Sequence, residues 1–236
     1  MPAVFALLAL ALLVSLGVWQ LHRLTWKEGL LVQIDQRLSA PPTPLPPRAQ
    51  WSSLFQDKDE YRHVSVTGRF EHDKEAYVFR TAGAGLGEAG FLVLTPLRLA
   101  DGSRILVNRG FVPERLRDPA TRAAGQTSGD VTVTGALRWP EDRNLFTPAD
   151  EPARRVWYTR DPVSMARALA LADAAPFSID ADVSADQSQP LHGGATVVSL
   201  RNDHLSYAVT WFGLAATLVG VFGVFAWRRL KTQSPG

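Results

Sequence analysis

Two long apolar segments, one near each end of the chain, flank a section in which hydrophobic and polar residues alternate over short runs. The first segment, residues 2–21, contains no charged residue. About twenty helical residues are enough to cross the ~30 Å hydrocarbon core of a bilayer. The second, residues 205–227, is equally apolar and is followed at once by Arg228, Arg229 and Lys231. Both segments are therefore predicted to be transmembrane helices.

A cleaved signal peptide is the alternative for the first segment, but no basic residue precedes it, its apolar run is longer than that of a usual signal peptide, and residues 17–20 offer no small-residue cleavage site. An uncleaved anchor is the preferred interpretation. The basic cluster after the second segment favours a cytoplasmic C-terminus, which with two spans places both termini in the cytoplasm. Basic residues after the first segment, Arg23 among them, favour the opposite orientation. The compact C-terminal cluster receives more weight, because long loops translocate largely regardless of charge.

Between the spans, the pattern changes twice. Helical periodicity continues through residues 26–38 and stops before the proline-rich run at 40–47. These prolines predict a stiff, extended spacer rather than a ligand for a peptide-binding domain. The predicted organisation is transmembrane helix 1 at 1–22, a helical extension and proline-rich linker at 23–50, a β-rich outer domain at 51–202, transmembrane helix 2 at 203–228 and a tail at 229–236.

Short runs rich in Val, Ile, Tyr, Phe and Thr, bounded by Gly, Asp and Pro, predict strands in the outer domain. They are 61–70, 75–80, 90–99, 103–112, 130–138, 155–159, 176–179 and 196–200. The Asp101-Gly102 pair predicts a tight hairpin between two of them. Residues 162–172 are the one predicted internal helix, with Asp161 as N-cap and Pro162 in the first turn. The expected fold is a mainly antiparallel sheet or small barrel.

Composition and motifs exclude several classes of function. Residues 28–206 carry all 23 acidic residues but 20 of the 25 basic ones, so the domain has no electrostatic surface suited to nucleic acid. The absence of cysteine excludes disulfides, thiolate metal sites and a cysteine nucleophile. The glycine-rich stretch at 83–90 precedes a strand rather than a helix, which argues against a nucleotide-binding loop. No recognised catalytic motif is present, and we expect no enzyme.

His204 is the histidine in the most distinctive setting. Asn202 and Asp203 precede it as candidate helix caps, and Tyr207 and Trp211 follow at i+3 and i+7. A histidine at the mouth of a span beside aromatic residues is a candidate axial haem ligand. An interfacial anchor or cap is the simpler interpretation of the pattern, which leaves both roles open.

At the end of the first span, Gln20, Arg23 and Lys27 share a helical spacing, with Trp19 and Trp26 adjacent. These side chains either extend toward lipid headgroups or pair with carboxylates such as haem propionates. Small residues four apart, at 11 and 15 and at 216 and 220, suggest that the two spans pack together.

Four blocks in order resemble the Surfeit locus family of cytochrome c oxidase assembly factors, and the resemblance extends over nearly the whole chain. The blocks are LGVWQLHRLTWKEGLL, YRHVSVTGRFEHDKEAYVFR, GFLVLTPLRLADGSRILVNRGFVP and NDHLSYAVTWFGLA. The resemblance implies a non-enzymatic helper that binds haem a and assists its insertion into oxidase subunit I. It also implies contacts with other oxidase assembly factors and a bacterial member in the cytoplasmic (inner) membrane, with the central domain periplasmic. The chain departs from the family pattern in lacking a basic lead before the first span.

The resemblance assigns His204 as the axial ligand of the haem iron. The other matching positions are cofactor-binding candidates at Trp19, Gln20, Arg23, Tyr207 and Trp211, and partner-surface candidates at Asn108, Arg109 and Gly110. Arg109 fits either a docking surface or a brace at a strand edge. Two rival functions stay open: a scaffold that stabilises a subunit I intermediate without binding haem, and, less favoured, an enzyme anchored on the outer face.

Overall fold

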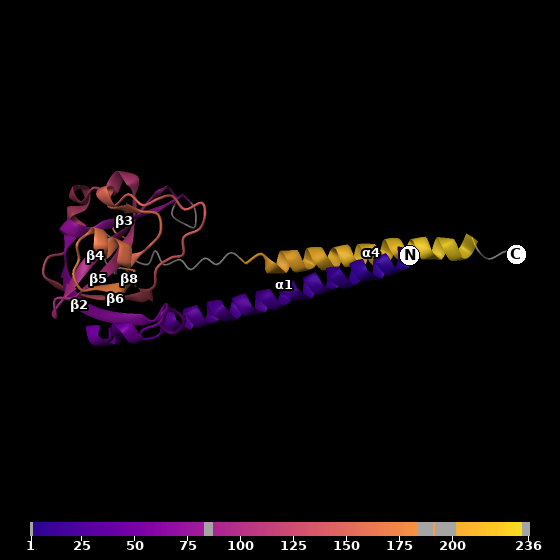
Figure 1. The fold of residues 1–236 in the computed structure, drawn as a ribbon, viewed down its shortest axis with the longest axis horizontal. Coiled ribbons are helices and arrows are strands. Elements are labelled where there is room, and N and C mark those ends of the chain that lie inside the picture. The colour runs from indigo at the N-terminus through magenta and orange to yellow at the C-terminus, as the bar shows by residue number, and fades with distance from the viewer. Residues whose placement is uncertain (1, 83–86, 184–190, 192–201, 233–236) are drawn as a thin grey trace. The chain divides into compact units, whose positions relative to one another are not determined.

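The computed structural model describes residues 2–82, 87–183, 191 and 202–232 of the 236-residue chain. The chain divides into two compact units (Figure 1). A helical unit comprises Met1–Ile34 and Leu200–Gly236, and a β unit comprises Asp35–Ser199.

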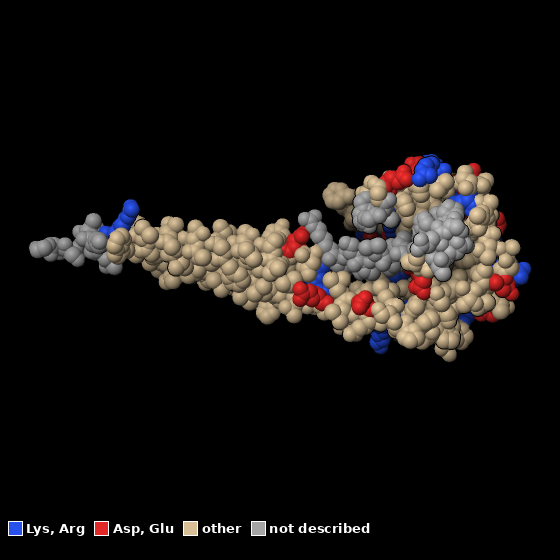
Figure 2. Space-filling model, turned by 180° about the vertical axis from the view of Figure 1, so that it is seen from behind, with Lys and Arg blue, Asp and Glu red and all other residues tan. Residues whose placement is uncertain are grey.

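The helical unit is built from α1 (Pro2–Ser39) and α4 (His204–Thr232). The predicted first span and its helical extension form one continuous helix of 38 residues, because no Pro or other strong breaker interrupts residues 3–39. The most apolar windows of the two helices have mean hydropathies of 2.3 and 1.9, so both are long and apolar enough to cross a membrane. Figure 2 shows Lys, Arg, Asp and Glu concentrated on the β unit, whereas most of the helical surface is uncharged.

The two helices pack along a seam of small residues. Gly17 faces the ring of Phe212 so closely that an added Cβ would lie 2.7 Å from a ring carbon. On α4, Ala208 and Ala215 are buried one heptad apart. The small residues predicted to form the interface, at 11, 15, 216 and 220, are exposed instead. The two spans therefore pack together as predicted, but through other residues, because spacing alone does not show which face of a helix meets its neighbour.

Eight strands lie in the part of the β unit that the structure describes. They are β1 (Thr43–Pro44), β2 (His63–Phe70), β3 (Ala76–Arg80), β4 (Gly90–Leu99), β5 (Arg104–Pro113), β6 (Asp130–Arg138), β7 (Val156–Trp157) and β8 (Ala174–Ala181). Two short α-helices and five 3₁₀ helices connect them: η1 (Arg48–Ser53), α2 (Gln56–Asp59), η2 (His72–Lys74), η3 (Glu114–Leu116), η4 (Pro119–Gly125), η5 (Pro152–Arg154) and α3 (Pro162–Ala168). The strand predicted at 196–200 lies outside the described residues.

The strands close into a ring. Their order is β1-β2-β6-β8-β5-β4-β3-β7, and β2 also pairs with β4, so β2, β6, β8, β5 and β4 form a small barrel. All pairings within this ring are antiparallel except β5 with β8. The expected barrel-like, mainly antiparallel fold is confirmed.

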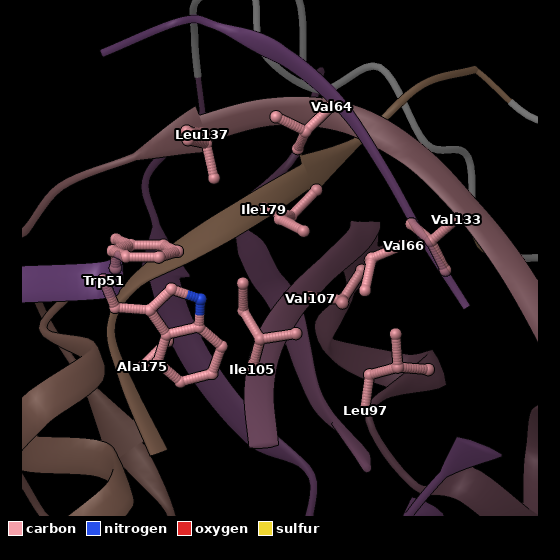
Figure 3. Close-up of a cluster of buried hydrophobic side chains, with 11 residues drawn as sticks. Trp51, Val64, Val66, Leu97, Ile105, Val107, Val133, Leu137, Ala175 and Ile179 are labelled. Atoms are coloured by element: carbon pink, nitrogen blue, oxygen red, sulfur yellow. The ribbon is translucent and has the colours of Figure 1, made fainter. Parts of the chain in front are cut away.

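Alternate residues of the ring strands fill the barrel. Figure 3 shows Val64 and Val66 of β2, Leu97 of β4 and Ile105 of β5 converging on this core, and Trp51 of η1 contributes to it. The Trp51 ring meets the ring of Phe177 edge-on, with 5.7 Å between centroids. A second buried cluster lies under α3, around Trp157 and Met165.

The proline-rich segment is not a free spacer. Its β1 pairs with β2 in parallel, and the Leu45 amide donates to the Ser65 carbonyl over 2.9 Å. The Trp51 indole N–H donates to the Pro46 carbonyl over 2.9 Å. Proline is tolerated here because an edge strand leaves one row of backbone groups unpaired. The boundary predicted at residue 50 is therefore too late, since the β unit begins at Asp35.

Two local predictions concern α3 and the β4–β5 hairpin. Asp161 caps α3 by accepting from the Ser164 amide, as predicted, but the helix ends at Ala168 instead of 172. Ala170, just beyond it, has a φ of 51°, which terminates a right-handed helix. The hairpin forms as predicted: Gly102 has a φ of 82° and Asp101 accepts from the Ser103 amide. The prediction of a single internal helix omitted the one-turn α2.

Candidate functional site

His204 is the first residue of α4, and its side chain is paired with α1. Its Nδ1 lies 2.7 Å from the Oε1 of Gln20. The Gln20 side chain faces α4, with 8% of the residue exposed. The structure therefore brings together two of the predicted cofactor-binding residues, which are separated by 184 positions in the sequence.

This hydrogen bond determines which imidazole nitrogen is available. An amide oxygen only accepts, so the bond forms when Nδ1 carries the proton. In the neutral ring, Nε2 then has a free lone pair. Histidines that bind a metal commonly donate their other ring N–H to a fixed acceptor, which sets both the tautomer and the ring orientation. The Gln20–His204 pair has this arrangement.

Arg23 lies about one turn beyond Gln20 on α1. Its guanidinium carbon lies 5.0 Å from the centroid of Trp26 and 5.9 Å from that of Trp19, within the range of cation–π attraction. Both tryptophans are more than half exposed. Of the three residues that share this helical spacing, Gln20 packs toward α4 and Arg23 lies between exposed indoles.

Tyr207 and Trp211 occupy different environments on α4. Tyr207 is exposed and Trp211 is half-buried, while Ala208 between them is fully covered. They offer an aromatic surface on the helix that begins at His204. Together with Trp19 and Arg23 they supply apolar and cationic groups in the same helical unit as the imidazole.

The residues proposed as a partner surface lie inside the β unit. Asn108 and Arg109 are only 3% and 8% exposed, and Gly110 is buried too. Asn108 donates to Asp180 over 3.0 Å and accepts from the Gly110 amide over 3.1 Å. Of the two roles left open for Arg109, bracing is the one that its burial fits. The expectation of a partner surface here is corrected because the side chains of Asn108 and Arg109 are buried and bonded to other residues of the β unit.

Arg109 joins a buried ionic cluster. It lies 3.7 Å from Glu75, whose carboxylate also pairs with the fully buried Arg122, and its guanidinium sits 4.8 Å from the ring of Phe70. Burial lowers the pKa of Arg109 to about 10, although Glu75 opposes this shift. Two buried guanidiniums against one carboxylate require the additional acceptor that the Gly125 carbonyl provides.

A second buried network surrounds Asp180. Arg160 and Arg138 lie 2.7 Å and 3.0 Å from its oxygens, and Arg160 also pairs with Glu141 at 2.7 Å. Burial by itself would raise the pKa of Asp180, but the two guanidiniums outweigh it and hold the pKa below its usual value. Sequence reasoning missed both networks. The one available signal was charged residues at inward-facing strand positions.

Comparisons with known proteins address the chain as a whole. The model of the SURF1 family matches residues 7–216, a range that contains both the barrel and the Gln20–His204 pair. The chain belongs to the SURF1 family. Surfeit locus protein 1 of Mus musculus is 40% identical, over 90% of this chain and 71% of the mouse protein. That of Takifugu rubripes is 39% identical, over 90% and 91% respectively. A SURF1-like protein of Monosiga brevicollis is 40% identical, over 93% and 85%.

The resemblance inferred from four sequence blocks is thus confirmed at the level of the SURF1 family. Within the part of the chain that the structure describes, no three or more His, Asp or Glu residues cluster in a way that could hold a metal ion. A haem iron needs only one or two protein ligands, so a single oriented imidazole such as His204 fits that group better than it fits a free metal ion.

Proposed function

We propose that this SURF1-family protein is an assembly factor for cytochrome c oxidase that binds haem a through His204 and delivers it to oxidase subunit I. The observation that supports haem binding is the hydrogen bond between His204 and Gln20, which leaves Nε2 free to coordinate iron. The reaction is binding and transfer, and no covalent bond has to be made or broken.

Other residues of the helical unit have properties suited to the rest of a haem. Arg23, held between Trp19 and Trp26, offers planar N–H donors of the kind that bind carboxylates such as propionates. Tyr207 and Trp211 offer aromatic surface to an apolar ring. The partners in this proposal are oxidase subunit I, other oxidase assembly factors and the lipid bilayer. The charge distribution argues against nucleic acid.

The proposed location is the cytoplasmic (inner) membrane of a respiring bacterium. Both helices have the length and hydropathy to span, and Arg228 and Arg229 close the second one. With both termini in the cytoplasm, the barrel lies in the periplasm and His204 begins its helix on that side.

The decisive test is the visible spectrum of the detergent-purified full chain, expressed with and without haem a synthesis. We expect the wild type to show a Soret band only when haem a is made, and His204→Ala to lose it because the axial nitrogen is gone. His22→Ala is the matched control: it removes an exposed histidine two residues from Gln20 and should keep the band.

Gln20→Leu probes the orienting bond separately. It keeps the size of the side chain but removes the acceptor, so haem affinity should fall about 10- to 100-fold while the ligand remains. A colourless wild type under haem-replete conditions would contradict the carrier proposal and support a scaffold that stabilises subunit I without haem. Oxidase assembly that is normal in His204→Ala would support the same alternative.

A further inference from the structure

The loop between β6 and β7 exposes two large apolar side chains. Leu145 is 93% exposed and Phe146 is 88% exposed, more than any other large hydrophobic residue in the described parts of the chain. We call these two residues the Leu-Phe tip. Isolated exposed apolar residues are normal on protein surfaces. An adjacent Leu and Phe that are both almost fully exposed suggest a binding site only if the backbone that carries them is also held in place, as it is in this loop.

The turn that carries the tip is held by its own side chains. The Asn144 side chain accepts from the Phe146 amide over 2.9 Å, and the Thr147 hydroxyl accepts from the Asn144 amide over 3.0 Å. The Thr147 amide donates back to the Asn144 carbonyl over 3.1 Å. Local bonds of this kind fix the backbone of a turn without help from neighbouring elements.

Both ends of the loop are fastened to the β unit. Glu141 pairs with Arg80 and Arg160 at 2.7 Å each, and its amide donates to the Arg160 carbonyl. Asp150 accepts from the Tyr158 amide over 3.0 Å and pairs with Arg143 at 2.8 Å. Arg143 also donates to the Pro148 carbonyl across the loop. The tip is therefore presented by a pre-organised loop, which lowers the entropic cost of binding.

The charges around the tip indicate what it meets. Glu141, Asp150 and Glu151 are each paired with arginines, Asp142 is exposed, and Arg143, the one basic residue in 140–151, is paired with Asp150. Segments that insert into a membrane surface typically surround their apolar residues with Lys and Arg, because the leaflet is anionic. Segment 140–151 therefore lacks the unpaired basic residues that attract an anionic leaflet, and its exposed Asp142 favours a protein with an apolar pocket and a basic group at the rim.

We propose that the Leu-Phe tip is the anchor by which the β unit docks into an apolar, basic-rimmed pocket on the oxidase subunit under assembly. The identity of the partner rests on the proposed function, whereas the position of the anchor is inferred only from the exposure and the bonds of the loop. An aromatic anchor flanked by a rim of polar groups is the usual form of a binding hot spot. Asp142 is placed to contribute to association by electrostatic attraction.

The test uses the full chain in a respiring host that lacks its own copy. Phe146 is replaced by the photoreactive amino acid p-benzoylphenylalanine, and adducts are identified by mass spectrometry and with antibody to subunit I. We expect an adduct with subunit I that is absent when the photoreactive group is placed at Phe55, an exposed phenylalanine elsewhere on the β unit. Adducts only with lipid, or only with a second copy of the chain, would overturn the proposal.

Substitutions then measure the contribution of the tip. The double variant Leu145→Ser, Phe146→Ser should bind the partner about 10- to 100-fold more weakly, because the two apolar side chains that would be buried on binding are gone. Phe55→Ser is the matched control and should have little effect. Asn144→Ala leaves the apolar side chains in place but loosens the turn, and should give an intermediate loss.

The Soret band of the double variant separates this proposal from the proposed function. A normal haem band with reduced oxidase supports the tip as a docking anchor. Wild-type levels of oxidase in the double variant, together with defective oxidase in His204→Ala, would contradict the docking role of the Leu-Phe tip and would remain consistent with haem delivery. Normal levels of oxidase in His204→Ala, with a retained subunit I adduct at position 146, would contradict haem delivery and would remain consistent with docking through the Leu-Phe tip.

Discussion

At the scale of single residues, the β unit depends on charges that water does not reach. Asp180 has almost no exposure and binds Arg160, Arg138 and Asn108. Removing one member of a buried ion pair leaves its partner as an uncompensated charge, which costs far more than the pair itself contributes. The barrel therefore tolerates loss of the whole network better than loss of one carboxylate.

Asp180→Asn should destabilise the protein by about 3–5 kcal/mol, because Arg160 is left buried without its main counter-charge. Urea unfolding of the full chain in detergent, followed by tryptophan fluorescence, measures the effect. Asp130→Asn breaks the exposed pair with Arg69 and should cost about 1 kcal/mol or less. Equal effects of the two changes would contradict the account of Asp180.

Residue types alone identified His204 and Gln20 as candidates, but not the bond between them. The sequence places Gln20 at a spacing shared with Arg23 and Lys27, and nothing in that spacing shows which of the three meets α4. Gly17 marks the face of α1 that contacts α4, because its lack of a side chain allows the Phe212 ring to approach the helix. Glycine at a helix contact is thus the signal that sequence reasoning overlooked.

At the scale of elements, local pattern predicted strands well and pairing poorly. The bounds of β4 and β6 agree with the predicted runs at 90–99 and 130–138. Burial alternates in the first half of β6, whereas residues 90–97 of β4 are all buried, as in a strand that is covered on both faces. The closure between β2 and β4, and the parallel pairing of β5 with β8, join residues far apart in the chain. A local pattern does not predict such long-range pairings. β1 was not predicted because it lies in a run of prolines, which is typical of a linker.

Gly17→Val should separate α1 from α4. The added side chain would overlap the Phe212 ring, and such overpacking costs about 1–3 kcal/mol. Because the chain lacks cysteine, spin labels can be attached to cysteines introduced at the exposed positions Val18 and Val209. We expect a longer and broader distance distribution in Gly17→Val.

Gly213→Val is the control for this measurement. It adds the same side chain to the same helical unit at a position with no atom within 4 Å of the new Cβ. An unchanged distance in Gly213→Val and a changed one in Gly17→Val would confirm the close contact. The same distance in all three proteins would contradict it.

At the scale of the whole molecule, the end of α1 is bonded to the barrel. Residues from Asp35 onward belong to the β unit, and Arg37 donates to the Glu60 carbonyl over 2.8 Å. His63 of β2 lies 2.7 Å from the Ala40 carbonyl through Nδ1 and 2.8 Å from Asp182 through Nε2. Residues 35–40 are therefore bonded to the rest of the β unit.

The attachment through His63 should weaken as the pH rises. Burial alone would lower the pKa of His63, but the Ala40 carbonyl and Asp182 outweigh it and raise the pKa. Both partners accept, so both bonds require the doubly protonated ring. Since the pKa is raised on folding, the stabilisation is complete below about pH 6.5 and is lost as pH rises through the folded value.

Hydrogen exchange at the amides of Ala40, Thr43 and Leu45, the residues of 40–47 that are not proline, measures this change at pH 5.5 and 8.5. Protection, corrected for the intrinsic pH dependence of exchange, should be lower at pH 8.5 in the wild type. His63→Gln should remove most of the difference, because glutamine does not titrate. A difference that persists in this variant would show that another group controls the segment.

The position of β8 in the ring also sets the order in which the domain can be completed during synthesis. β8 pairs with β5 and β6, yet it follows β5 by about sixty residues. At a translation rate of ~5–20 residues per second, one edge of β5 stays unpaired on the nascent chain for about 3–12 s. During that interval the half-built barrel exposes apolar surface, so successful biogenesis depends on a holding chaperone or on rapid capture by β8.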